Sequence, residues 1–406
     1  MRTIHRKPAP PRPIGDNLFD LWMIANKMFE FEGAIANGAN IERVEFPLYG
    51  SYDRSLVDHL ESMFDFLFDK RVRVSLAMNN QERLTTSDEE DGDILSDGYT
   101  CLFSLGLDSF SGITNAVAHY DDLIGAFVSH ADQRNLVPLL KKFQRGPLKQ
   151  AGITVKRINA TDHEPFLRRS RGIFYIMNAI TLGRRNFLVC DIGPTMYPTP
   201  FTILDKITVT THPKMLEYAK IISKDILNKE VRILTPNENL TKAEVAAACQ
   251  SSSFIKKTFS CTRTSFANSP IPNCGTCYSC IVRRMGALVA GVVDSKYRND
   301  FTTIANRSGA YDNLVQLLRF SMDFIDDPEQ IPWYSLEIPR AYEKLELFER
   351  FALDNIVGLK ILDDLMDLSS PLAKIRSLAT TVVTDNQLEE RIAVVQEGQY
   401  QPRLVN

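Results

Sequence analysis

Strand-like and helix-like segments alternate between residues 99 and 250, and this alternation constrains the fold more than any other feature. Apolar runs predict five strands, at residues 100–104, 123–129, 153–158, 186–191 and 230–234. Helical spacing of apolar residues predicts helices at residues 109–119, 132–149, 170–184, 213–228 and 241–250. Repeated strand–helix units predict an α/β fold with a mostly parallel, doubly wound sheet that helices cover on both faces.

The first strand–helix unit contains a short polar turn, Ser104-Leu105-Gly106-Leu107-Asp108-Ser109. Free backbone N–H groups and the dipole of the following helix favour a bound phosphate at such a turn. The hydroxyls of Ser104 and Ser109 add donors, and Asp108 is a candidate ligand for Mg²⁺ beside the phosphates. No lysine follows Gly106, so the turn is not a GxxxxGK[ST] loop. A glycine- and serine-containing turn after a strand is also common without a ligand, so the turn alone leaves a structural role open.

Further polar groups follow other predicted strands of the same sheet. In parallel sheets, ligands bind beyond the carboxyl ends of the strands, where the strand order reverses. We therefore expect these groups and the turn at Ser104–Ser109 to share one cleft. The groups are Ser129-His130, Asp191-Ile192-Gly193 and Thr235-Pro236.

The segments on either side of residues 99–295 have a different pattern. Residues 1–98 predict a small α+β domain, with a basic, proline-rich arm, an acidic linker at residues 88–93 and a docking or scaffolding role. Its predicted elements are helices at residues 17–36 and 55–68 and strands at residues 41–48 and 71–77. Residues 296–406 predict a helical region for packing or oligomerisation, with helices at 313–324 and 347–365, a break near Pro328 and Pro332, and a loose end after about residue 390.

Composition excludes several classes of protein. The chain has 406 residues and a formal net charge of −3, so no overall basic field favours nucleic acid as a partner. The basic start has no apolar core of the kind found in a signal peptide, and no apolar run approaches the roughly 18 residues of a membrane span. We therefore expect a soluble, cytoplasmic protein whose seven cysteines are reduced.

Four of the cysteines have the spacing of a metal site. Cys261 is followed by a C-x2-C-x2-C run formed by Cys274, Cys277 and Cys280. Four thiolates close a tetrahedral Zn²⁺ site, and Gly275 allows the tight backbone of such a knuckle. An iron–sulfur cluster uses similar spacing, so zinc, iron–sulfur and metal-free cysteines all stay open, with zinc favoured. The remaining cysteines are expected to be packed thiols on core faces: Cys101, Cys190 and Cys249.

The turn and the cysteine run together resemble one enzyme family. The turn resembles the Ser-Gly-Gly-x-Asp-Ser pyrophosphate-binding loop (PP-loop) of N-type ATP pyrophosphatases. The cysteine run continues to Arg283 as Cys-Gly-x-Cys-x-x-Cys-x-x-Arg, which resembles the end motif of the 7-cyano-7-deazaguanine synthase (QueC) family. Residues 99–295 are similar to that family over roughly half of the chain. Further similar positions are Gln133-Arg134, Arg171, Thr235-Pro236 and Lys242-Ala243-Glu244.

The resemblance implies a PP-loop (HUP-like) fold that uses ATP, Mg²⁺ and Zn²⁺. It implies an enzyme that joins a 7-deazaguanine carboxylate to AMP, releases pyrophosphate, and then forms an amide or nitrile with ammonia. The implied ATP-binding residues are Ser104, Leu105, Gly106, Leu107, Asp108, Ser109 and Ser129. The implied catalytic residues are Asp108, Lys242 and Arg171, the substrate-binding residues are Asp191 and Arg283, and the zinc ligands are Cys261, Cys274, Cys277 and Cys280. A surface lysine at 242 and structural salt bridges at the two arginines are the alternatives.

The sequence departs from the family at Leu105, which replaces a glycine. If that backbone needs a positive φ, leucine costs about 1–2 kcal/mol; otherwise its side chain points away harmlessly. Residues 191–198 also differ from the family's substrate-binding stretch. These two departures leave a lost nitrile step or a different substrate open, and Leu105 favours a degenerate nucleotide-binding scaffold as an alternative. A PP-loop enzyme that adenylates a tRNA base is the other alternative. The added flanks resemble synthase-like proteins of antiphage defence operons, which implies a protein amine as acceptor, a partner bound through residues 1–98 or 296–406, and a homodimer as one arrangement.

Overall fold

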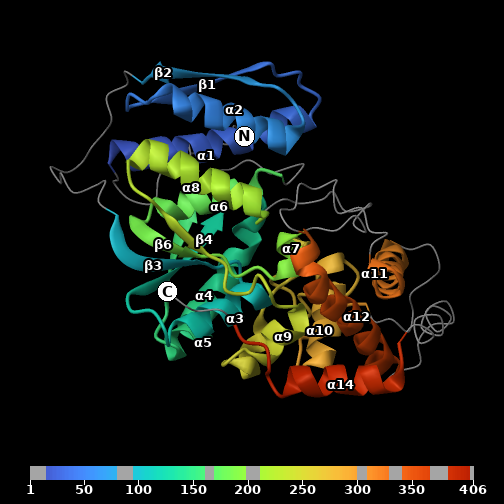
Figure 1. Ribbon diagram of the computed structural model, residues 1–406. Helices are drawn as coiled ribbons and strands as arrows, with labels where there is room; N and C mark the ends of the chain where they lie inside the picture. The colour runs from blue at the N-terminus through green and yellow to red at the C-terminus, as the bar shows by residue number, and fades with distance from the viewer. Residues whose placement is uncertain are drawn as a thin grey trace, which may run out of the picture.

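A five-stranded parallel sheet forms the centre of the computed structural model, which describes residues 15–79, 95–160, 169–197, 211–299, 309–328, 341–365 and 383–402. Its strands run in the spatial order β5-β4-β3-β6-β7 (Figure 1). Because the chain proceeds outward from β3 in one direction and then returns to β6 on the other side, the strand order reverses between β3 and β6. The five predicted strands are confirmed as β3 (Ser96–Leu102), β4 (Leu123–Ser129), β5 (Thr154–Asn159), β6 (Arg184–Leu188) and β7 (Arg232–Leu234).

Both faces of the sheet are buried, as the apolar runs predict. Along β4, Phe127 points into one apolar cluster, while Ala126 and Val128 point into the other. The same alternation places Phe187 of β6 in the cluster of Ala126, and Leu188 in that of Phe127. This two-residue period confirms a doubly wound α/β sheet, because each face needs its own layer of helices.

Two sets of helices cover the faces. Helices α6 (Arg171–Ile180) and α8 (Pro213–Leu227) lie on one face, and α3 (Leu107–Ala116) and α4 (Val137–Arg145) contribute to the other. The single helix expected at residues 132–149 is instead a 3₁₀ turn (Ala131–Leu136), α4 and the short α5 (Pro147–Gln150). Pro147 has no N–H to continue α4, which explains the break.

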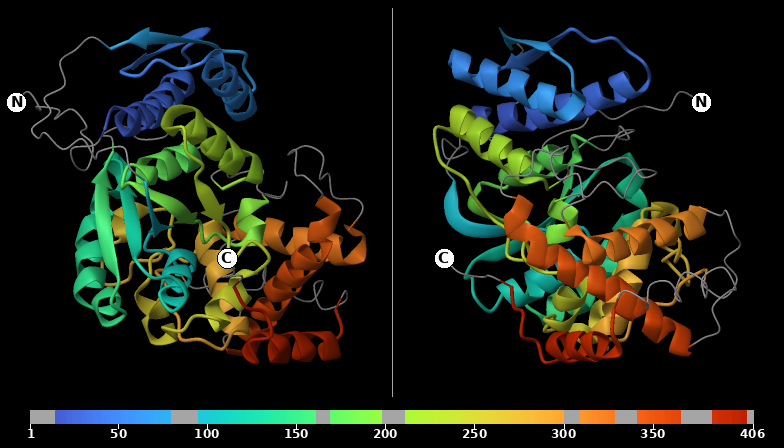
Figure 2. Two further views of the ribbon diagram at one scale, coloured as in Figure 1. Left: turned by 60° about the vertical axis from the view of Figure 1, so that its left-hand side comes forward. Right: turned by 45° about the vertical axis from the view of Figure 1, so that its right-hand side comes forward.

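The N-terminal segment folds as a helix followed by a strand–helix–strand unit. Helix α1 (Asp16–Ala36) precedes β1 (Arg43–Leu48), α2 (Arg54–Phe68) and β2 (Arg73–Met78), and β1 and β2 pair in parallel. Figures 1 and 2 show this segment stacked on α6 and α8, on one side of the central sheet. One apolar cluster is continuous from β1, α1 and α2 into α6 and α8, so the N-terminal segment shares its core with the sheet.

Helices α10 (Tyr278–Val289), α11 (Gly309–Asp326), α12 (Leu345–Leu365) and α14 (Asp385–Gln396) form the C-terminal part of the structure (Figure 1). The expectation of a loose chain after about residue 390 is wrong as far as Gln396. Thr384 and Gln387 form a capping box that starts α14, and Leu388 and Val395 are buried. A 3₁₀ turn at Ala341–Lys344 precedes α12.

Several sequence-based expectations concern residues outside the described ranges. They are the basic arm at residues 1–14, the acidic run at residues 88–93, and Pro332. The domain boundaries at residues 98 and 295 stay predictions. Among the described residues, no helix is long and apolar enough to cross a membrane.

Candidate active site

A cavity of about 310 Å³ lies at the carboxyl end of the sheet, where the strand order reverses. Chain segments that follow β3, β4 and β6 contribute to its lining, together with α6 and residues 259–264. Most of the sequence-predicted residues meet there. Those in the lining are Ser104, Gly106, Leu107, Asp108, Ser109, Arg171, Asp191, Lys242 and Cys261. The cleft expected from the strand ends is therefore present in part. His130 and Asp191 are in its lining, but Ile192, Gly193, Thr235 and Pro236 are not.

The Ser104–Ser109 turn is held together by its own hydroxyls. The two serine Oγ atoms are 3.1 Å apart, and the backbone N of Ser104 donates to Ser109 Oγ at 3.2 Å. Gly106 is the N-cap of α3, so the backbone N–H groups of the first turn of α3 begin at the cavity. The turn is also tied to residues 259–260, since Phe259 N donates to Leu105 O at 2.8 Å and Leu107 N to Ser260 Oγ at 3.4 Å.

The sequence left two possibilities for Leu105: a strained backbone with positive φ, or a side chain that points away. The structure shows both. The φ of Leu105 is +67°, which is the left-handed region where a leucine is strained. Its side chain points away from the cavity and is fully buried in the apolar cluster around α3. The leucine side chain therefore leaves the cavity side of the turn clear, although its backbone is strained.

Leu105→Gly is expected to lower the free energy of unfolding by up to about 4 kcal/mol. Relief of the positive-φ strain returns about 1–2 kcal/mol, whereas loss of a fully buried leucine side chain costs about 2–5 kcal/mol. Urea denaturation of the variant and the parent protein measures the difference. A more stable variant would show that strain dominates over packing at this position.

Lys242 approaches the turn from the start of α9 (Lys242–Ala247). Its Nζ lies 2.5 Å from both carboxylate oxygens of Asp108. The side chain of Lys242 is 11% exposed and lines the cavity, so the alternative of a surface lysine is wrong. Lys242 therefore brings its ammonium group to Asp108 in the turn, although the two residues are 134 positions apart in the sequence.

The start of α9 is held by the C-terminal helices. Thr241 and Glu244 form a capping box around the first turn of α9. The buried Glu244 carboxylate accepts from Arg350 Nε of α12 at 2.8 Å and from Arg391 Nη2 of α14 at 2.7 Å. Helices α12 and α14 therefore hold a capping residue of α9, the helix that carries Lys242.

The cavity lining also contains further groups of mixed charge. Asp191 accepts a hydrogen bond from Thr211 Oγ1 at 2.8 Å, and Arg171 lines the cavity from the first turn of α6. Burial and then the negative charge of Asp108 raise the pKa of the Asp191 carboxyl. His130 Nε2 and Tyr175 Oη are 3.1 Å apart in the same lining.

Sequence reasoning did not select two of these cavity residues, Tyr175 and Thr211. It placed His130, at the end of β4, in the cleft but gave it no role. Tyr175 lies four residues after Arg171 on the same helix. Residues at this spacing share one helix face, so the position of Arg171 was a signal for Tyr175. Thr211 lies far from Asp191 in the sequence, in no recognisable motif.

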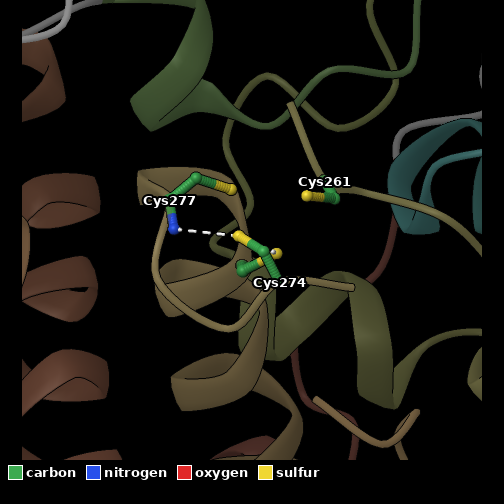
Figure 3. Close-up of side chains that lie close together, drawn as sticks. Cys261, Cys274 and Cys277 are labelled. Atoms are coloured by element: carbon green, nitrogen blue, oxygen red, sulfur yellow. Dashed lines mark hydrogen bonds between the residues drawn. The ribbon is translucent and has the colours of Figure 1, made fainter. Parts of the chain in front are cut away.

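The four predicted zinc ligands come together as one buried group, and Figure 3 labels three of them, Cys261, Cys274 and Cys277. All four Sγ atoms lie within 4.8 Å of one another, and those of Cys274 and Cys280 are 3.9 Å apart. Tetrahedral zinc with bonds of about 2.3 Å requires sulfur–sulfur distances of about 3.8 Å, so the group fits this ion. Gly275 has φ +83°, and the backbone N atoms of Thr276 and Cys277 donate to Cys274 Sγ at 3.4 Å and 3.3 Å.

Hydrogen bonds among the four thiols shift their ionisation in opposite directions. They lower the pKa of the Cys274 and Cys277 thiols and raise the pKa of those of Cys261 and Cys280. A thiolate is the form that binds metal, and a closed set of four leaves no open position for a substrate. The cysteines expected to be packed thiols are buried outside this group; the Sγ atoms of Cys101 and Cys190 are 3.6 Å apart.

Residues 205–291 match the family model described as Queuosine biosynthesis protein QueC. No curated protein matches the chain. The matched segment includes α8, β7, α9 and the complete cysteine group, whereas the Ser104–Ser109 turn lies before it. The match indicates a QueC-like domain over residues 205–291.

Besides Leu105, two more of the predicted ATP- and substrate-binding residues, Ser129 and Arg283, lie outside the cavity lining. Ser129 Oγ donates to Ile158 O at 3.1 Å and lies 3.0 Å from Asn159 Oδ1, so it faces β5. The fully buried Arg283 donates to Asp294 Oδ1 at 2.6 Å and 2.9 Å, and to backbone oxygens of residues 255 and 258. The structure thus places Arg283 in the salt bridge that was its alternative reading, and we leave both residues out of the proposed site.

Proposed function

We propose that this protein is an ATP-dependent carbon–nitrogen ligase that activates the carboxylate of a 7-deazaguanine-type base, such as 7-carboxy-7-deazaguanine. The contact between Lys242 and Asp108, inside a strand–turn–helix loop at the cavity, carries the proposal. It supplies a cation at the point where helix N–H groups and serine hydroxyls favour the phosphates of ATP. The QueC-like match of residues 205–291 supports the same reaction class.

In the first step, an oxygen of the substrate carboxylate attacks the α-phosphorus of ATP. The bond to the β-phosphate oxygen breaks, and pyrophosphate leaves with additional negative charge. The first turn of α3, the hydroxyls of Ser104 and Ser109, and the ammonium of Lys242 stabilise that charge. Asp108 orients Lys242 and is a candidate ligand for Mg²⁺, which neutralises phosphate charge when it is bound.

In the second step, an amine attacks the acyl carbon of the adenylate, loses a proton and displaces AMP, which yields an amide. Arg171 is the group proposed to hold the substrate carboxylate, and Asp191 the group that reads the guanine-like edge. Both line the cavity, and His130 and Tyr175 belong to the same lining. A second ATP can activate the amide for dehydration to a nitrile.

The acceptor amine is ammonia or a protein amine within this proposal. A protein amine, a partner bound through residues 1–98 or 296–406, and a role in antiphage defence rest on the resemblance in architecture alone. A cytoplasmic location and a homodimer likewise stay predictions.

Conversion of ATP to AMP by the purified, zinc-loaded protein tests the proposed function. We expect AMP and pyrophosphate in the presence of 7-carboxy-7-deazaguanine and little of either in its absence. Added ammonia or a candidate protein partner should increase turnover if it is the acceptor. ATP binding without AMP would favour the nucleotide-binding scaffold, and AMP formation that depends on tRNA would favour a tRNA-modifying enzyme.

A further inference from the structure

A buried carboxylate of the N-terminal helix α1 contacts the start of a cavity helix. Glu32 has no exposed surface, and its Oε1 accepts from the backbone N of Arg169 at 2.5 Å. Its Oε2 accepts from the backbone N of Ser170 at 3.2 Å and from the Ser170 hydroxyl. Both oxygens of one side chain are therefore used on two consecutive residues that lie 137 and 138 positions away in the sequence.

Those two residues, Arg169 and Ser170, immediately precede α6. Ser170 is its N-cap, and Arg171, its first helical residue, lines the cavity. The first N–H groups of a helix have no partner inside the helix, and negative charge beside them is favourable. The Ser170 side chain makes no capping hydrogen bond to α6 itself, and Glu32 accepts from the Ser170 hydroxyl. Glu32 therefore holds the backbone immediately before Arg171, at the start of α6.

Helix α1 also packs behind a neighbouring part of the cavity wall. Phe29, one turn before Glu32, stacks on Phe174 of α6 with ring centroids 4.2 Å apart. The ring centroid of Phe29 is 5.5 Å from that of His130, whose Nε2 contacts Tyr175 Oη. Phe29 has no exposed surface, so it lies behind the cavity residues.

We propose that Glu32 is a positioning residue for the proposed substrate-binding residues of the cavity. It acts through the start of α6 on the placement of Arg171, and the N-terminal segment thereby completes the substrate pocket. This inference deepens the proposed function and rests on it. It assigns residues of the N-terminal segment a part in substrate binding, where the sequence indicated docking or scaffolding.

The chain contains a matched control for Glu32. Asp20, also on α1, has no exposed surface and accepts from two consecutive backbone N atoms, those of Tyr49 and Gly50, at 2.9 Å and 2.8 Å. Its Oδ2 also accepts from a hydroxyl, that of Tyr52, at 2.7 Å. Asp20 and Glu32 therefore make the same kinds of contact, but the groups that Asp20 holds are outside the cavity lining.

The test compares Glu32→Gln with Asp20→Asn in the full-length, zinc-loaded protein. We expect Glu32→Gln to raise the KM for 7-carboxy-7-deazaguanine by roughly 5- to 30-fold, the factor for loss of one helix-capping contact, with the KM for ATP unchanged. Asp20→Asn should lower the melting temperature to a similar extent and leave both KM values unchanged. Deuterium exchange of a peptide spanning residues 169–177 should accelerate in Glu32→Gln alone. Ser170→Ala, which removes only the hydroxyl contact, replaces Glu32→Gln if that variant does not fold.

Two results would overturn the inference. One is unchanged exchange at residues 169–177 in Glu32→Gln, and the other is faster exchange with an unchanged KM for the base, which would make Glu32 a structural residue only. A parent protein that forms no AMP would instead contradict the proposed function. The exchange measurement needs no substrate, so it would still decide whether Glu32 fixes the start of α6.

Discussion

Lys242→Met is expected to lower the rate of AMP formation by about 10²- to 10³-fold, the typical effect of removing one donor that stabilises charge in a transition state. Lys242 brings its ammonium to the Ser104–Ser109 turn, where pyrophosphate carries its additional charge as it leaves. Methionine keeps much of the length and apolar volume of the lysine stem, so the change removes mainly the charge. Steady-state AMP release at saturating ATP and 7-carboxy-7-deazaguanine measures the effect.

Lys344→Met is the matched control. Lys344 is also largely buried, at 12% side-chain exposure, and its Nζ pairs with Glu238 Oε1 at 3.1 Å, but it is not part of the cavity lining. Both variants lose one partly buried ion pair, so their melting temperatures should fall by similar amounts. Equal rates of AMP formation in the two variants would remove Lys242 from the proposed mechanism.

Cys274→Ser is expected to abolish zinc binding and to unfold the chain around the cysteine group. Structural zinc contributes about 10–16 kcal/mol to the folding of small zinc domains, which is as large as the roughly 5–15 kcal/mol of net stability of a typical protein. Cys274 is fully buried and its Sγ accepts from the backbone N atoms of Thr276 and Cys277, so its loss affects both the metal and the knuckle. Zinc content by mass spectrometry and the melting temperature measure the two effects.

The same variant should also lose ATP binding. Phe259 and Ser260, which immediately precede Cys261, hold the Ser104–Ser109 turn through Leu105 O and Leu107 N. Cys249→Ser is the matched control, because Cys249 is a buried thiol outside the group. It should retain one zinc per chain. A Cys274→Ser protein that keeps its zinc and melts at the parent temperature would contradict the assignment of this site.

Local patterns in the sequence were sufficient for much of the fold. Parallel strands buried on both faces leave continuous apolar runs, and these runs located β3 to β7 to within a few residues. The zinc ligands were predictable for the same reason, because Cys274, Cys277 and Cys280 are close in sequence and a tight knuckle brings them to one ion. Both signals lie within a single element or turn, where spacing alone determines geometry.

Contacts between distant segments required the tertiary structure. The sequence indicated Lys242 and Asp108 separately, but only the packing of α9 against α3 places their charged groups 2.5 Å apart. Arg283 belongs to the same recognisable motif as the cysteines, yet its position on α10 directs it to Asp294, outside the cavity lining.

The sequence by itself therefore determined the α/β fold class, the strands and the cysteine site, since each depends on residues that are neighbours in the chain. Tertiary structure alone decided the order of the strands and the positive φ and buried side chain of Leu105. It also decided the contact of Glu32 with the start of α6. Such contacts join segments more than a hundred residues apart, and they leave no periodic pattern because a single carboxylate can hold any backbone N–H that folding brings to it.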